Sequence, residues 1–201
     1  VILNVAGNRT VDPSMKNVLK EALLGSKTSQ ENVPGTSVKK ISAKGKVVEG
    51  NIFNFEGIPV IPINQGGVHG AGLARQARRR GILNKDNGVD TKFKVSNIKV
   101  TLPVKKHWKQ RVNMKLLGES LYKLEQVAMK YPKETFLLPL VGLGHGEGNP
   151  NVIVPILKKM INKHKNIKIV LPTKDVNIPR GTARTDRSLE YMPVIKKMLD
   201  C

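Results

Sequence analysis

Cysteine, aromatic residues and long apolar runs are all scarce in this sequence. Cys201 is the single cysteine among 201 residues, which excludes an intramolecular disulfide and fits the cytoplasmic location that we expect. Aromatic residues make up 4% of the chain, so aliphatic side chains must build most of the core. No apolar run approaches the roughly 20 residues that cross a membrane as a helix, and the apolar residues 1–7 lack the basic start of a signal peptide. We therefore expect no membrane partner.

Acidic residues are few as well. Lysine and arginine number 35 against 15 for aspartate and glutamate, which leaves a formal net charge of +20. Such a charge attracts polyanions such as nucleic acid, although lysines spread over the whole chain are equally consistent with a basic, solvated surface. We find no pattern of basic residues interleaved with aromatic ones, and therefore predict no stacking on single-stranded bases.

The first part of the chain differs in pattern from the rest. Residues 1–7 have the pattern of a strand, and Asp12 with Pro13 has the pattern of a helix start. Val18, Leu19, Ala22 and Leu23 continue this helix pattern, and residues 25–45 are rich in serine, threonine, glycine, lysine and proline, which is typical of an irregular connection. We therefore predict an N-terminal extension at residues 1–45 and a core domain at residues 46–201.

The core domain alternates strand and helix patterns. Strand patterns occupy residues 46–49, 58–64, 98–103, 135–141 and 167–171. Helix patterns occupy residues 70–80, 111–130 and 187–199, the last kinked or split at Pro193, and a further helix begins at an Asn149 cap and buries Ile153, Ile156, Leu157 and Met160. This alternation predicts an α/β fold in which helices cover both faces of a largely parallel sheet. Ligands of such sheets bind beyond the carboxyl ends of the strands.

Two glycine-rich segments stand at those ends. The first glycine segment, residues 64–72, and the second glycine segment, residues 142–148, each leave an apolar strand and enter a helix. Glycines let backbone N–H groups approach a ligand, and a helix start adds oriented donors, so each segment suits a phosphate. A tight turn explains one such segment equally well, but two in a small domain favour a clamp around a diphosphate. Neither has the P-loop or dinucleotide fingerprint, and we expect no metal ion and no cofactor.

Four segments, in order, resemble one known family. They are residues 47–53 (VVEGNIF), 64–74 (NQGGVHGAGLA), 102–108 (LPVKKHW) and 139–144 (PLVGLG). Together they resemble macro domains, in particular the subclass of the terminal ADP-ribose protein glycohydrolase and the DNA ADP-ribosyl glycohydrolase of DarT–DarG systems. The resemblance covers residues 46–172. It implies a three-layer α/β macro-like fold with a mostly parallel, mixed central sheet that binds ADP-ribose.

The resemblance also implies roles for individual residues. Macro domains use an aspartate to accept a hydrogen bond from the adenine amino group, and Asn51 stands at that position here. The first glycine segment would surround the distal ribose, and the second would hold the diphosphate. The implied ligand-binding residues are Asn51, Ile52, Asn64, Gly67, Val68, His69, Gly70, Ala71, Gly142, Gly144, His145, Gly146, Glu147 and Gly148.

Lys105 matches the catalytic lysine of that subclass. A lysine amine is nucleophilic only when it is neutral, and neighbouring Lys106, the net positive charge and burial all favour the neutral form. The amine could attack the anomeric carbon of the ribose or polarise the leaving group. Where one glycohydrolase of the subclass has an aspartate, this chain has Gly146, so its neighbours His145 and Glu147 are the candidate general bases.

The function that we expect is binding of ADP-ribose and hydrolysis of an ADP-ribosyl linkage on a macromolecule, with DNA among the candidates. Three alternatives stay open: a module that sequesters ADP-ribose without turnover, a phosphatase acting on ADP-ribose 1″-phosphate, and a basic nucleic-acid-binding protein whose glycine segments are only turns. We expect His107 and Trp108 to pack or to position the segment after the strand, and His164, at a lysine-rich helix end, to be solvated.

Overall fold

The computed structural model describes residues 40–173 and 189–200. The expected strand at residues 1–7 and the helix after it lie outside the described residues. The described end of the predicted extension contacts the domain, because Ile41 forms a parallel bridge with Phe55. The boundary between extension and core domain stays a prediction.

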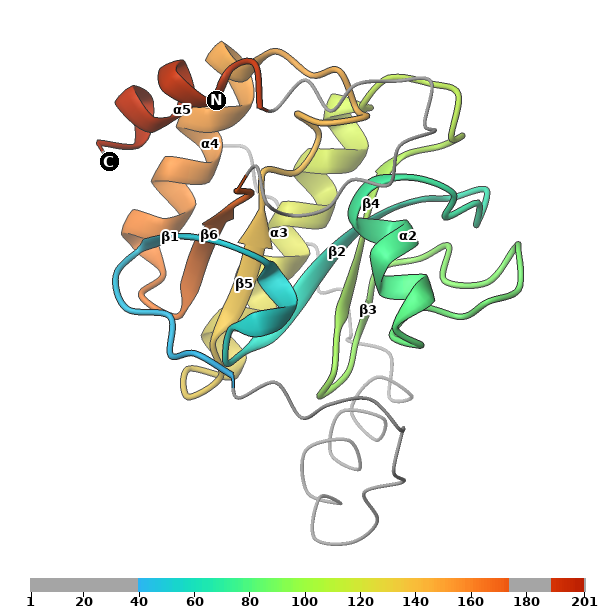
Figure 1. Cartoon of the computed structure of the whole chain (residues 1–201), viewed down its shortest axis with the longest axis horizontal. Coiled ribbons are helices and arrows are strands. Elements are labelled where there is room, and N and C mark those ends of the chain that lie inside the picture. Colours follow the sequence, from blue (N-terminus) through green and yellow to red (C-terminus); the bar gives the residue numbers. More distant parts are fainter. Residues whose placement is uncertain (1–39, 174–188, 201) are drawn as a thin grey trace, which may run out of the picture.

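A six-stranded mixed sheet forms the centre of the domain (Figure 1). Its strands lie in the order β1-β6-β5-β2-β4-β3, and every neighbouring pair is parallel except β3 and β4. The strands are β1 (Val47–Glu49), β2 (Ile58–Asn64), β3 (Lys94–Val95), β4 (Val100–Lys105), β5 (Phe136–Pro139) and β6 (Ile167–Leu171). The helices are the 3-10 helix η1 (Ile52–Asn54) and α2 (Gly72–Arg79), α3 (Met114–Lys130), α4 (Pro150–Lys163) and α5 (Met192–Leu199).

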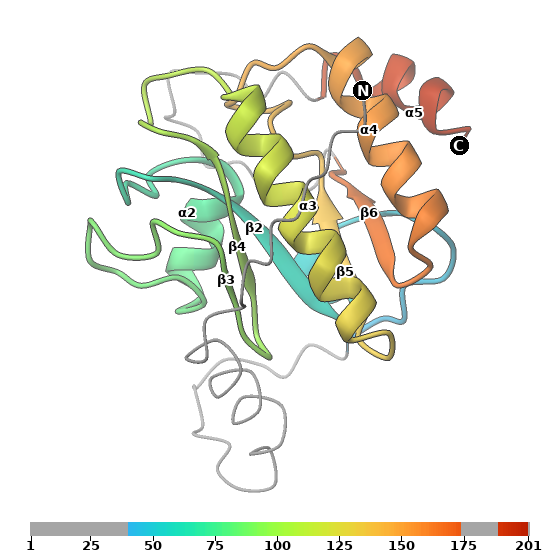
Figure 2. The ribbon, with the colours of Figure 1, turned by 180° about the vertical axis from the view of Figure 1, so that it is seen from behind.

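Helices cover both faces of this sheet, as predicted. Helices α3 and α4 lie side by side on the face turned to the viewer in Figure 2, α2 lies on the other face, and α5 packs against α4. The central strand β2 shows why the chain folds in this way. Val60 packs in the cluster with α3 and α4, whereas Ile61 and Ile63 pack in the cluster with α2. A strand buried on both faces needs apolar residues at consecutive positions, which is the pattern of β2.

The observed elements differ from the predicted ones in a few places. The bounds of β2 and β6 are those predicted, but the edge strand β3 and the helix η1 are too short to produce a periodic pattern. Helix α5 begins at Met192, so Pro193 lies in its first turn, where proline is tolerated. The expectation that Pro193 kinks or splits a helix is therefore wrong.

The burial of two side chains, Ile156 and His164, differs from the prediction. Ile156 is exposed, and α4 buries Val154 and Ile161 in its place. At 3.6 residues per turn, the buried face of α4 turns away from Ile156. His164 is buried rather than solvated, and its Nε2 lies 3.3 Å from the carboxylate of Glu125 on α3.

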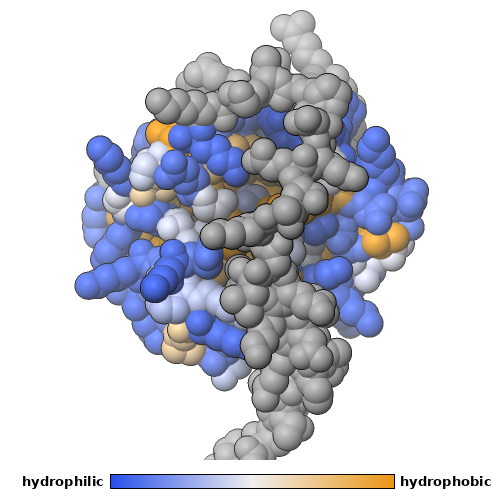
Figure 3. All heavy atoms as spheres, turned by 90° about the horizontal axis from the view of Figure 1, so that it is seen from below, coloured by the Kyte–Doolittle hydropathy of each residue, from blue (hydrophilic) through white to orange (hydrophobic). Residues whose placement is uncertain are grey.

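The face of the domain seen from below is mostly hydrophilic, with isolated hydrophobic residues (Figure 3). The five parallel strands begin toward this face, because they run upward in Figure 1, whereas β3 runs the opposite way. Their carboxyl ends therefore lie at the opposite end of the molecule. Among the described residues, no helix is both long enough and apolar enough to span a membrane.

Candidate ligand-binding site

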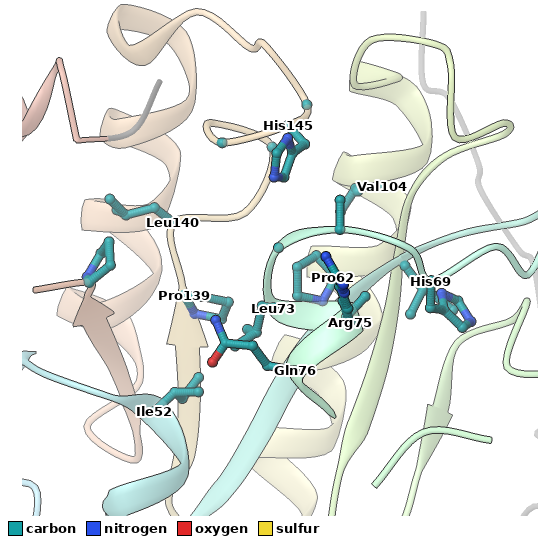
Figure 4. Close-up of a pocket in the computed structure, with 18 of the residues that line it drawn as sticks. Ile52, Pro62, His69, Leu73, Arg75, Gln76, Val104, Pro139, Leu140 and His145 are labelled. Atoms are coloured by element: carbon teal, nitrogen blue, oxygen red, sulfur yellow. The ribbon is translucent and has the colours of Figure 1, made fainter. Parts of the chain in front are cut away.

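A cavity of about 630 Å³ lies at the carboxyl ends of β2, β4 and β5. Its volume is within the range of small-molecule sites, roughly 300–1,000 Å³. Strand β2 stands between β4 and β5, so the segments that follow three neighbouring strands meet here. Figure 4 shows side chains around the cavity: Ile52, Pro139 and Leu140 on one side, Val104 and His69 on the other.

The cavity begins where two central strands separate. The pairing of β2 with β5 ends at the Pro59–Leu137 pair, whereas the pairing of β2 with β4 continues to the end of β2. Beyond that point Pro62 has no N–H to donate across the gap, and it lines the cavity together with Pro139. The proline pattern of the strands therefore helps to open the sheet for a ligand.

The first glycine segment is organised by an asparagine. Asn64 is buried, its Nδ2 donates to the carbonyl of Val68 at 2.6 Å, and its Oδ1 accepts from the Val68 N–H at 3.3 Å. Gly67 has a φ of +70°, and a Cβ there would lie 2.5 Å from the backbone nitrogen of Gly88. Gly70, in contrast, lines the cavity and has nothing within 4 Å of its Cβ position. Gly67 therefore serves packing, and Gly70 is open to a ligand.

His69 connects the same segment to the loop before β3. The ring is buried, and its Nε2 lies 3.2 Å from the carbonyl oxygen of Val89. Burial lowers the pKa of His69 below its usual 6.5, although the Val89 carbonyl and the Asp90 carboxylate oppose this shift. A neutral ring that donates from Nε2 leaves Nδ1 as an acceptor, and that buried atom has no hydrogen-bond partner among the described residues. The side chain therefore orients the segment in its neutral form.

The second glycine segment is organised by its own backbone. The Gly148 N–H donates to the carbonyl of Gly142 at 2.8 Å. A Cβ at Gly146 would lie 2.5 Å from that same carbonyl oxygen, and a Cβ at Gly148 would lie 2.4 Å from Cδ1 of Ile153. These positions require glycine because the turn packs tightly against itself and against α4.

The two glycine segments approach each other closely at Gly72 and His145. Gly72 has a φ of +55°, and a Cβ there would lie 2.9 Å from Cδ2 of His145. Gly72 and Ala71, at the start of α2, both line the cavity. The first N–H groups of a helix have no carbonyl partner within the helix and carry partial positive charge. This wall therefore suits an anion.

Lys105 joins the second glycine segment to the segment that follows β4. Its Nζ donates to the carbonyl of Trp108 at 3.2 Å and to the carbonyl of His145 at 3.0 Å. All three residues line the cavity. The structure therefore brings together Lys105 and His145, two of the three predicted catalytic residues.

The third predicted catalytic residue, Glu147, is not among the residues that line the cavity. One of its carboxylate oxygens lies 3.3 Å from Nε of Arg111 in an ion pair. Gly67 and Gly148 also lie outside the lining. The other predicted ligand-binding residues do line it: Asn51, Ile52, Asn64, Val68, His69, Gly70, Ala71, Gly142, Gly144, His145 and Gly146.

Asn51 has a structural partner as well as a place in the cavity wall. It caps η1, because its Oδ1 accepts from the Phe53 N–H at 3.1 Å. The neighbouring Ile52 is buried and contributes apolar surface to the cavity. The resemblance assigns the position of Asn51 to adenine and includes Ile52 among the ligand-binding residues.

Sequence reasoning missed the contribution of α2. Arg75 and Arg79 are four residues apart, so they lie on one face of the helix, and both line the cavity with Gln76 between them. The signal was present in the spacing of these arginines directly after the first glycine segment. Among the described residues, no group of histidine, cysteine and acidic side chains could hold a metal ion.

These features define an α/β domain with a ligand cavity between two glycine segments at the carboxyl edge of its sheet. Comparison with models of protein families gives no match, and neither does comparison with curated proteins. Solved structures do match in fold.

Two DarG macrodomains and one DarTG complex are among the solved structures that match. DarTG from Thermosipho africanus, solved in complex with ADP-ribose, has a TM-score of 0.50 and 18% identity, over 66% of this chain and 42% of that one. The macrodomain of Mycobacterium tuberculosis DarG has a TM-score of 0.49 and 18% identity, over 65% of this chain and 99% of that one. The macrodomain of Thermus aquaticus DarG has a TM-score of 0.45 and 21% identity, over 64% and 97%. The chain therefore has the α/β fold with a mostly parallel, mixed central sheet that the four segments predicted, and the Thermosipho africanus structure shares this fold.

Proposed function

We propose that this chain binds ADP-ribose in the cavity and removes an ADP-ribosyl group from a macromolecule. The observation that carries the proposal is the meeting of the two glycine segments, with His145 against Gly72 at the start of α2. Backbone N–H groups and a helix start together suit a diphosphate. The similar fold of the Thermosipho africanus structure that holds ADP-ribose supports this choice of ligand.

Charged and apolar parts of the cavity fit the same ligand. Arg75 and Arg79 of α2 line it, and they complement an anionic diphosphate. Ile52 and Leu140 offer an apolar surface for a planar base. A mostly apolar cavity with a few convergent polar groups is the usual form of a nucleotide site.

In the proposed reaction, water attacks the anomeric carbon of the distal ribose while the bond from that carbon to the macromolecule breaks. The amine of Lys105, held by the carbonyls of Trp108 and His145, stabilises the negative charge that develops on the leaving group. The imidazole of His145 accepts the proton of the attacking water. We assign this step to His145 rather than to Glu147, because Glu147 is paired with Arg111 outside the cavity lining.

One observation favours a second candidate, a module that binds ADP-ribose without turnover. The hydrogen bonds of Lys105 also join two segments of the cavity wall, which is a structural use of the side chain. Release of free ADP-ribose from an ADP-ribosylated substrate by the wild-type protein separates the two functions. Tight binding without any release favours the module.

Binding itself is tested by calorimetric titration with ADP-ribose, and with ATP and NAD as competitors. Gly70→Val should block the cavity, because Gly70 is open toward the ligand. Gly118→Val is the matched control: Gly118 lies in α3, and its Cβ position also has nothing within 4 Å. Both variants should fold, and only Gly70→Val should lose ADP-ribose. Normal binding by Gly70→Val contradicts the proposed site.

A further inference from the structure

The apolar part of the cavity wall carries two amide side chains and no carboxylate. Ile52 and Pro139 belong to this part, and the amide of Gln76 points toward both of them in Figure 4. Asn51 lines the cavity directly before Ile52. Among the described residues that line the cavity, none is an aspartate or a glutamate. A planar base that packs on this wall therefore meets amides as its hydrogen-bonding partners.

The orientation of the Asn51 amide is fixed by the helix that it caps. Its Oδ1 accepts from the Phe53 N–H at 3.1 Å, a bond that the amide nitrogen cannot make because it is a donor. Nδ2 has no hydrogen-bond partner among the described residues, and the side chain is only partly buried. The oxygen of Asn51 is thus already used within the protein, whereas both N–H groups remain for a ligand.

Phe53, which holds this amide, is itself held in place. Its ring packs against the cluster that contains Ile61 and Ile63, and the guanidinium of Arg80 lies 4.8 Å from the ring centroid. The Asn51 amide therefore cannot turn over without losing its bond to a fixed backbone group. Gln76 differs, because it has no hydrogen-bond partner among the described residues and can rotate to suit a donor or an acceptor.

We propose that the cavity prefers a nucleoside diphosphate ribose whose base has a carbonyl group at C6, such as hypoxanthine, over one whose base has an amino group there. Nδ2 of Asn51 donates to the carbonyl oxygen, whereas the amino group of adenine is itself a donor. The inference rests on the proposed function, because it names the base of the ligand at that same site. It sets this chain apart from the aspartate that the resemblance implies, since a carboxylate only accepts.

Calorimetry with two ligands tests the preference. Inosine diphosphate ribose (IDP-ribose) and ADP-ribose differ in the base alone. The wild type should bind IDP-ribose about 5-fold more tightly, the effect of one hydrogen bond between neutral groups. Equal affinities, or tighter binding of ADP-ribose, overturn the preference and leave the proposed function standing. If neither ligand binds, the proposed function fails and the preference fails with it.

Asn51→Asp tests the residue. The variant keeps the size of the side chain and the oxygen that accepts from Phe53, but it replaces the donor with an acceptor. It should reverse the preference, so that ADP-ribose binds more tightly than IDP-ribose. The added negative charge opposes the diphosphate of both ligands alike, and the ratio of the two dissociation constants is therefore the readout.

Asn54→Asp is the matched control. It adds the same charge in the same helix η1, and Asn54 is not among the residues that line the cavity. The ratio of the two dissociation constants should stay at its wild-type value in this variant. An unchanged ratio in Asn51→Asp overturns the proposal, and so does an equal change of the ratio in both variants.

Discussion

The two glycine segments border the same cavity but are held in different ways. In the first, the side chains of Asn64 and His69 hold the backbone in place. In the second, the backbone holds itself, with Gly146 and Gly148 packed against Gly142. Similar composition therefore serves two purposes: Gly70 leaves open space for a ligand, whereas Gly67, Gly146 and Gly148 allow close packing. The number of glycines in a loop does not by itself distinguish a ligand contact from a tight turn.

The largest effect should come from adding one methyl group to the tightly packed segment. A Cβ at Gly146 would approach three backbone atoms of Gly142, which cannot yield as the end of a side chain can. Gly146→Ala should therefore lower the free energy of unfolding by about 3 kcal/mol in urea titrations. Gly70→Ala, made in the open segment, should leave it nearly unchanged. Equal stabilities of the two variants would contradict the conclusion that Gly146 is tightly packed and Gly70 is open.

The next effect concerns Lys105, which joins the second glycine segment to the segment that follows β4. Lys105→Ala should lower kcat and kcat/KM together by about 100-fold, because the proposed role of the amine is to stabilise the transition state, and it should keep ADP-ribose binding. The measurement is release of ADP-ribose from an ADP-ribosylated oligonucleotide. Lys106→Ala removes the same charge one residue away and is the control. Small, equal effects from both variants argue that Lys105 is not the catalytic group.

A smaller effect should appear when the side-chain support of the first segment is removed. Asn64→Ala leaves the N–H and the carbonyl of Val68 without their partner, at a cost of about 1–2 kcal/mol of stability. It should also weaken ADP-ribose binding in calorimetry. Asn166→Ala is the control, because Asn166 donates to three carbonyls that lie away from the cavity. Asn166→Ala should lose stability but still bind ADP-ribose. If both variants lose ADP-ribose binding, the loss in Asn64→Ala comes from lower stability and not from the cavity.

The smallest effect is a dependence of stability on pH in the first segment. Because burial lowers the pKa of His69 in the folded protein, the unfolded chain takes up the proton first as the pH falls. The contribution of neutral His69 is therefore fully present above pH 6.5 and is lost below it. Urea titrations at about pH 5 and about pH 7.5 should show a smaller loss of stability in His69→Gln than in the wild type. An identical loss in both proteins would assign the dependence to other groups.

Segments with a strong local pattern were predictable from sequence. Strands β2 and β6 have the predicted bounds, and the predicted Asn149 cap accepts from the N–H of Asn151 at 2.9 Å. The two-residue β3 was missed, because two residues cannot show an alternation. The prediction that α4 buries Ile156 was wrong, because residues next to each other in a helix are separated by less than a third of a turn, and the pattern did not define the edge of the buried face.

Parts of the site were predictable for a similar reason. Lys105 and the glycine segments each follow a strand, and the carboxyl ends of parallel strands lie at one edge of a sheet. The pairing of Glu147 with Arg111, 36 residues apart, has no local signature, and it removes one expected general base from the cavity lining. The spacing of Arg75 and Arg79 is a local signal for a shared helix face, but whether that face turns to the cavity depends on how α2 packs.

The sequence by itself determined the alternation of strands and helices, the helix caps and the place of each glycine segment after a strand. These features depend on residues close together in the chain, so local patterns contain them. Tertiary structure decided the order of the strands, the contact of His145 with Gly72, and the position of Trp108 at the rim of the cavity. Those contacts join residues far apart in the chain, and they arise only when the buried faces of the sheet pack against their helices.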